Sequence, residues 1–201
     1  MEEEIRILDD ICIEISQERV LETAGCVKGT GAYGKALALL PELEAGLRGA
    51  AAPRAWIAFG RARWYCLLTL GGGVEPYLSA CVKEGLLKGV AAESMAQELF
   101  FEFDHAVTEV LRQECKDRKI GISRRLEAPC QLPFETQKEI LEEIERYIVT
   151  GIQLSENYVF APPRTLGYIL ETCPDPACFH AAHSCSGCGS QSCPRRKGQK
   201  K

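Results

Sequence analysis

The 201-residue sequence predicts an α+β domain with a twisted, mainly antiparallel sheet flanked by helices, and a Cys-rich metal-binding C-terminal tail. Stretches of helical periodicity interleave irregularly with short apolar runs typical of strands. With 46% hydrophobic residues, the chain can bury one sizeable core. Five of the eleven cysteines lie between Cys173 and Cys193. We therefore expect a folded domain over residues 1–170 and a metal-binding tail with a basic end over residues 171–201.

The first quarter of the chain predicts strands and then helices. Residues 5–15 are rich in β-branched apolar side chains, which favours one or two strands. Ser16 follows as a suitable N-cap for a short helix that ends at Gly25. Helical periodicity continues over residues 32–47, where Pro41 lacks a backbone donor and so predicts a kink or a new helix start.

The middle of the chain predicts two strands and then two helices. Residues 55–59 and 62–70 are aromatic and aliphatic runs bounded by glycines, which is typical of strands. A helix is expected over residues 74–83, and the longest periodic stretch covers residues 90–115. The acidic side chains of that stretch fall largely outside its apolar stripe. We expect four of them to be solvated, namely Glu98, Glu102, Asp104 and Glu109.

The pattern after residue 115 predicts three further strands around one helix. Residues 120–125 favour a strand, and residues 134–149 favour an amphipathic helix. Residues 151–160 and 165–170 predict two more strands that Pro162-Pro163 separates.

The cysteines near the C-terminus carry the strongest chemical signal. Cys185 and Cys188 flank Ser186 and Gly187, and these small residues let the loop curl so that both thiolates reach one metal. Cys193 supplies a third ligand at a distance that a short loop can span. The fourth ligand stays open among Cys173, Cys178, His180 and His183. The candidate metal ligands are therefore Cys173, Cys178, Cys185, Cys188 and Cys193. Soft thiolate ligation favours a [4Fe-4S] cluster slightly over zinc, whereas the histidines favour zinc.

Disulfides, an unstructured reactive tail and chance spacing are the alternatives to a metal site. No apolar signal peptide precedes the acidic start of the chain, so an oxidising compartment is not indicated and a cytoplasmic protein is expected. The other six cysteines are scattered, and most of them should be reduced core residues. Cys130 is the exception, since it could be a redox thiol or a further metal ligand.

Charge and hydropathy exclude several classes of partner. The net charge of −4 gives no general reason to expect nucleic acid, and apolar stretches such as residues 64–70 are far shorter than the roughly 20 residues that span a bilayer. A zinc-ribbon protein that binds nucleic acid is an alternative resting only on the tail and its basic end. That end contains Arg195, Arg196, Lys197, Lys200 and Lys201.

Residues 151–168 read GIQLSENYVFAPPRTLGY and contain a G-x-x-L-S-E-N segment, two prolines and a strand-like run. Further upstream, residues 68–71 (LTLG) precede a helix, and residues 133–137 (PFETQ) open another. In this order, the motifs resemble the activation domain of vitamin B12-dependent methionine synthase. The likeness covers most of the chain and is greatest to stand-alone members with a Cys-rich C-terminal tail.

The resemblance implies an accessory role in a methionine synthase-type methyltransferase system. When the cob(I)alamin form of a corrinoid is oxidised, such a domain binds S-adenosylmethionine, and an electron plus its methyl group restore methylcobalamin. The implied partners are a corrinoid protein or cobalamin-dependent methionine synthase, which carries the cobalamin, and an electron donor. Whether the chain is itself catalytic stays open. The alternative is a non-catalytic module that docks on a corrinoid protein and uses zinc to fix its tail.

The family's S-adenosylmethionine loop is R-x-x-x-G-Y, and only its arginine is present here. When residues 133–137 are aligned with the corresponding family segment, Arg124 falls on the arginine of this pattern, Ala128 on the glycine and Pro129 on the tyrosine. The resemblance implies that Arg124 holds the ligand's carboxylate. A helix glutamate of the family corresponds to Glu98 or Glu102, and Arg164 and Tyr168 are pocket candidates. The candidate cofactor-binding residues are Arg124, Ala128, Glu98 and Tyr168.

Overall fold

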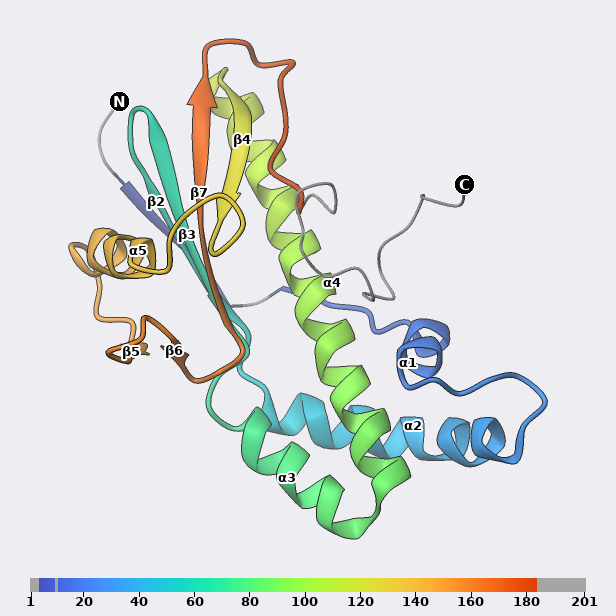
Figure 1. The fold of residues 1–201 in the computed structure, drawn as a ribbon. Helices are drawn as coiled ribbons and strands as arrows, with labels where there is room; N and C mark the ends of the chain where they lie inside the picture. The colour runs from blue at the N-terminus through green and yellow to red at the C-terminus, as the bar shows by residue number, and fades with distance from the viewer. Residues whose placement is uncertain (1–3, 10, 184–201) are drawn as a thin grey trace.

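The computed structural model describes residues 4–9 and 11–183, and its strands form two sheets (Figure 1). The larger sheet contains β1 (Glu4–Leu8), β2 (Arg54–Phe59), β3 (Arg63–Thr69), β4 (Gly121–Glu127) and β7 (Thr165–Cys173). Its strand order is β1-β2-β3-β7-β4, and every neighbouring pair is antiparallel. The smaller sheet pairs β5 (Gln153–Leu154) with β6 (Phe160–Ala161).

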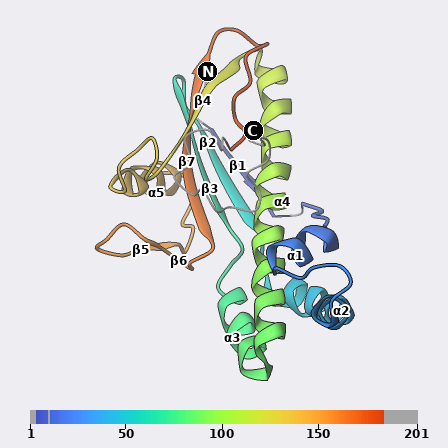
Figure 2. The same cartoon turned by 45° about the vertical axis from the view of Figure 1, so that its right-hand side comes forward.

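The helices lie on both sides of the large sheet. They are α1 (Gln17–Thr23), α2 (Gly31–Ala50), α3 (Val74–Glu84), α4 (Leu86–Arg118) and α5 (Thr136–Glu145). The long helix α4 runs past one face of the sheet, and α1, α2 and α3 gather around its N-terminal half (Figures 1 and 2). The short helix α5 and the β5–β6 hairpin cover the opposite face (Figure 2).

Period-two alternation along β3 divides the buried residues between the two faces. Trp64 and Cys66 belong to the large core against α4, whereas Leu67 belongs to the smaller core beneath α5. The rings of Phe59 and Trp64 meet edge to face, with centroids 4.8 Å apart. The sheet is therefore buried on both faces in its centre.

The predicted α+β class with an antiparallel sheet is confirmed. The helix after Ser16 is also present, and the Ser16 hydroxyl accepts a hydrogen bond from the backbone of Arg19. Pro41 starts no new helix, because α2 continues through it from Gly31 to Ala50. Of the helices in the described part of the chain, none combines the length and the apolar composition needed to cross a membrane.

Three element predictions were wrong in extent. No strand covers residues 11–15. Residues 151–160 do not form one strand, because the chain reverses there, with Tyr158 at a φ of 59°, and leaves only the short strands β5 and β6. The helix expected over residues 134–149 is shorter, since α5 runs only from Thr136 to Glu145.

Candidate functional site

Strand β4 directs two adjacent arginines to opposite faces of the sheet. Ile122 pairs with Thr172 and Arg124 with Glu171, so Ser123 is an extra residue that forms a β-bulge. Ile122 packs in the core against α4, and the bulge therefore turns Arg124 to the α5 side and Arg125 to the α4 side.

Arg124 lies in a row of charges that crosses three strands. Its Nη2 and Nε are 2.7 Å and 2.8 Å from Oε2 of Glu171, while Arg63 lies 3.9 Å from the other oxygen of that carboxylate. The side chain of Arg124 is 66% exposed. An exposed ion pair of this kind stabilises by at most about 1 kcal/mol. Arg124 can therefore exchange Glu171 for a ligand carboxylate at little cost.

Arg125 is instead the centre of a buried polar cluster. Its side chain is 3% exposed, and Nη1 donates to both oxygens of Asp104 at 3.0 Å and to the carbonyl of Ala181 at 3.2 Å. Its Nε lies 2.5 Å from Glu127, and its guanidinium stacks 3.7 Å from the ring centroid of Tyr168. Burial raises the pKa of Asp104, and Arg125 opposes that shift. The cluster holds β4, β7 and α4 together, and Arg125, Asp104 and Tyr168 within it are buried.

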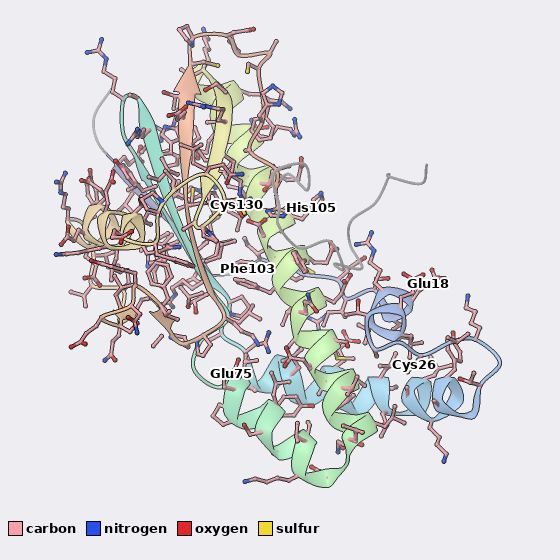
Figure 3. All side chains as sticks on the ribbon, in the orientation of Figure 1. Glu18, Cys26, Glu75, Phe103, His105 and Cys130 are labelled. Carbon is pink, nitrogen blue, oxygen red and sulfur yellow. The ribbon has the colours of Figure 1, made fainter. Side chains whose placement is uncertain are left out.

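The loop after β4 carries the positions at which the sequence departs from the R-x-x-x-G-Y pattern. The Ala128–Pro129 peptide is cis, and the loop is closed by Gln131, whose backbone donates to the carbonyl of Glu127 at 2.8 Å. Pro129 presents neither an amide donor nor an aromatic ring. Cys130 is exposed on this loop (Figure 3), and Cys26 lies beside α1 in another part of the molecule.

The other candidates for cofactor binding lie on the α4 side of the sheet. Glu98 is 2% exposed and faces Arg19 at 3.6 Å, and Tyr168 is fully buried beneath Arg125. Burial raises the pKa of Tyr168 well above its ordinary value. The expectation that Glu98 and Asp104 are solvated was wrong, since both are buried. Arg124 and Ala128 therefore lie at the β4 edge of the sheet. Glu98 of α4 and Tyr168 of β7 are buried in the interior of the protein.

The remaining two pocket candidates are also occupied by protein partners. Arg164 binds both oxygens of Glu93 at 2.7 Å and 2.8 Å, and its Nε lies 3.1 Å from Glu75. Glu102 accepts from Arg19 at 2.6 Å. These pairs fasten α1, α3 and the β6–β7 connection to α4. A role of either residue in ligand binding stays a prediction.

A C-terminal strap, residues 174–183, follows β7 and packs against β4. Ile122 donates to the carbonyl of Cys178 at 2.9 Å and accepts from the backbone of His180 at 2.9 Å, which forms a short parallel bridge at Phe179. Arg112 of α4 stacks 4.1 Å over the Phe179 ring. The strap ends at His183, whose Nδ1 lies 3.0 Å from Glu127. The sequence offered no periodic signal for this packing.

The strap brings the first two predicted metal ligands together. Cys173 and Cys178 both adjoin Gly121, since a Cβ there would lie 2.9 Å from Cys173 Sγ and 2.6 Å from the Cys178 carbonyl. Burial and a hydrogen bond with Cys173 raise the pKa of the Cys178 thiol. Within residues 4–9 and 11–183, no group of three or more metal-ligating side chains is placed to hold an ion. Cys185, Cys188 and Cys193 lie outside the described residues, so the five-cysteine site stays a prediction.

The scattered cysteines mostly behave as core residues. Four of them are buried and free of disulfides, namely Cys26, Cys66, Cys81 and Cys115. Burial raises the pKa of the Cys66 thiol to about 12, so this side chain stays neutral in the core. Cys12 and Cys130 are exposed.

Comparison with known proteins supports the fold and nothing finer. The sequence matches no protein-family model and no curated protein. The structure is similar to the "Crystal Structure of the MetH Reactivation Domain bound to AdoHcy", with a TM-score of 0.52 and 10% sequence identity. The match covers 90% of this chain and 82% of that one. The two proteins therefore share a fold over nearly their whole length.

Proposed function

We propose that this protein assists the reductive reactivation of a corrinoid-dependent methyltransferase, with S-adenosylmethionine as the methyl donor. The observation that carries the proposal is the fold shared, over 90% of the chain, with a MetH reactivation domain bound to AdoHcy. AdoHcy is what remains of S-adenosylmethionine once its methyl group has been transferred. On this proposal the partner is a corrinoid protein or cobalamin-dependent methionine synthase, which carries the cobalamin.

Arg124 is the residue of this chain best placed to hold the methyl donor. Its guanidinium is exposed and already binds a carboxylate, Glu171, with two nitrogens. A ligand carboxylate can take the same two positions. Ala128 would then line the approach to the loop. Glu98 and Tyr168 would act from the interior, by supporting α4 and β7 rather than by touching the ligand.

The electron is proposed to pass through the C-terminal cysteines. Cys173 at the end of β7 and Cys178 on the strap lie beside β4, and Cys185, Cys188 and Cys193 follow within a short length of sequence. A [4Fe-4S] cluster bound by these thiolates supplies one-electron chemistry whose potential depends on burial and hydrogen bonds. Zinc at the same position would give a structural tail without electron transfer.

Calorimetric titration with S-adenosylmethionine tests the role of Arg124. We expect micromolar binding that Arg124→Ala weakens at least about tenfold, because a charge-assisted bidentate contact is lost. The matched control is Arg54→Ala, since Arg54 is similarly exposed and pairs with Asp9 at the far end of β2. Equal binding by both variants would exclude Arg124 as the carboxylate ligand.

A non-catalytic corrinoid-binding module with a structural zinc tail is the second candidate. It is favoured by the separation of Arg124 on one face from Glu98 and Tyr168 in the interior, and by Pro129 in place of an aromatic residue. This function predicts no heat of binding with S-adenosylmethionine, together with retained association with a corrinoid protein.

A further inference from the structure

The turn between β2 and β3 borders an open surface cavity of about 240 Å³ that no part of the proposed function uses. It is lined by the turn residues and by α5 and its C-terminal extension, including Gly60, Arg61, Arg63, Tyr65 and Tyr147. This volume is below the roughly 300–1,000 Å³ of pockets for drug-sized ligands. A ligand with a single ring therefore matches the space better than a nucleotide.

The turn that forms the cavity is held rigidly. The amide of Gly60 donates to the carbonyl of Arg63 at 3.0 Å, and a Cβ at Gly60 would lie 2.6 Å from that oxygen. Thr172 of β7 fixes the next residues, because its hydroxyl donates to the carbonyl of Arg61 and its amide to that of Ala62, both at 3.0 Å. The lining of the cavity is thus already in place before a ligand arrives.

The arginines at the cavity have fewer close ion pairs and hydrogen bonds than the glutamates beside them. Arg63 lies 3.8 Å from Glu139 and 3.9 Å from Glu171, beyond hydrogen-bond distance of either. Arg61 is exposed, and its guanidinium has no hydrogen bond or ion pair with any residue that the structure describes. Glu143, in contrast, is bound by Arg146 at 2.8 Å. Arg61 is therefore available to an anion, and Arg63 can reach the same anion from two ion pairs that are longer than hydrogen bonds.

Two tyrosine rings line the cavity, and Tyr65 stays neutral. Tyr65 donates to Oε1 of Glu139 at 2.8 Å, and burial together with Glu139 raises its pKa to about 12. Tyr147 is 38% exposed, so part of its ring faces solvent. Neutral tyrosine rings stack on flat ligands without adding a charge that would repel an anion.

We propose that this cavity binds a small anion that carries one aromatic ring, with its oxyanion held by Arg61 and Arg63 and its ring against Tyr65 and Tyr147. Glu171 pairs with both Arg63 and Arg124, so the site adjoins the one proposed for the methyl donor but holds its ligand through other residues. The inference does not depend on the corrinoid function.

Phenyl phosphate is the probe, and its binding to the full chain is followed by NMR of backbone amides and arginine Nε–H groups. We expect shifts confined to the turn and to the end of α5, with inorganic phosphate and phenol each binding at least about tenfold more weakly. Arg61→Ala should weaken phenyl phosphate about tenfold and leave the melting temperature unchanged, because the side chain is exposed. Arg54→Ala, at the other end of β2, should bind like the unmodified protein.

If inorganic phosphate binds as tightly as phenyl phosphate, the aromatic ring contributes nothing and that part of the proposal is wrong. If Arg61→Ala and Arg54→Ala weaken the binding of phenyl phosphate equally, the protein attracts anions through its general charge and not at this cavity. Shifts located elsewhere would also refute it. None of these results bears on the calorimetric titration with S-adenosylmethionine, so the two proposals can fail separately.

Discussion

Two neighbouring arginines on β4 differ completely in environment. Arg124 is 66% exposed with one carboxylate partner, and Arg125 is 3% exposed between two carboxylates and a tyrosine ring. The bulge at Ser123 decides which arginine faces which side. Removing a charge in the interior leaves a buried charge of opposite sign without compensation, whereas the partner of a removed surface charge stays solvated.

Arg125→Ala should therefore lower the free energy of unfolding by about 3–5 kcal/mol, because Asp104 would remain buried without its cationic partner. Arg124→Ala should change it by less than about 1 kcal/mol. Urea denaturation of both variants measures the difference. Similar losses in the two would mean that Arg125 does not organise the buried cluster.

The ion pair between His183 and Glu127 predicts how the strap responds to pH. The hydrogen bond with Glu127 raises the pKa of His183 above its ordinary 6.5. Burial opposes ionisation of Glu127, yet His183 and Arg125 lower its pKa below 4.5. The stabilisation by His183 is therefore complete below its unfolded pKa of 6.5 and is lost as pH rises through its raised folded value. On the acid side, the contribution of Glu127 is lost as pH falls through its lowered value.

His183→Gln should accordingly reduce stability most below the unfolded pKa of His183 and above the lowered pKa of Glu127, and its effect should fade as pH rises through the raised pKa of His183. The loss should stay below about 1 kcal/mol, because the His183 side chain is 36% exposed. Thermal unfolding across this range checks the prediction, with His180→Gln, an exposed position on the same strap, as the control. A constant difference at all pH values would contradict it.

The limits of sequence-based inference are clearest for single charged residues. Spacing in the 90–115 stretch identified the apolar stripe, but Asp104 and Glu98 lie on helix faces that contact Arg125 of β4 and Arg19 of α1. Such coverage depends on contacts between segments far apart in the chain. The same holds for Arg125, whose partner Ala181 is 56 residues away.

At the scale of elements, hydrophobic periodicity predicted the longer helices and strands. The short strands and their turn depend on local backbone geometry. The runs of β2 and β3 were found because each contains enough alternating or apolar residues to mark a strand. The β5–β6 hairpin was missed because its strands have two residues each and its turn uses Tyr158 at positive φ. Neither feature leaves a pattern long enough to recognise.

Helix α2 contains a matched pair of glycines that tests its packing. A Cβ at Gly46 would lie 2.6 Å from the ring of Tyr77 on α3, whereas a Cβ at Gly49 meets nothing within 4 Å. Tyr77 cannot move freely, because its hydroxyl donates to the carbonyl of Leu43 at 3.0 Å. Gly46→Ala should therefore destabilise by about 1–3 kcal/mol.

Gly49→Ala should be neutral or stabilising by up to about 1 kcal/mol, since alanine favours a helix more than glycine does. Thermal and urea unfolding of the two variants, one turn apart on the same helix, provides the measurement. If both substitutions stabilise, α2 does not pack against Tyr77 as described.

At the scale of the whole molecule, α4 connects the two parts of the fold. Its 33 residues pack against α1, α2 and α3 at one end and against β4 and the strap at the other (Figure 1). The strap adds the Ile122 bridge and the Ala181 contact to this frame. The buried core of the described residues thus includes the strap at Ala181. Cys185, Cys188 and Cys193 of the predicted metal site follow the strap in the sequence.

This arrangement predicts that metal binding and folding of the core separate. Anaerobically purified protein should be brown with broad visible absorption, and Cys185→Ser should lose the colour together with iron and sulfide. Cys12→Ser, an exposed thiol far along the chain from the tail, should keep both. With a chelator present, the melting temperatures of the unmodified protein and of Cys185→Ser should agree within a few degrees, because the large buried core already contains residues of the sheet, of α1 to α4 and of the strap. A colourless preparation with one equivalent of zinc would remove the electron-transfer role and favour the structural tail. Unfolding of the core on chelation would show instead that the metal is required for the fold.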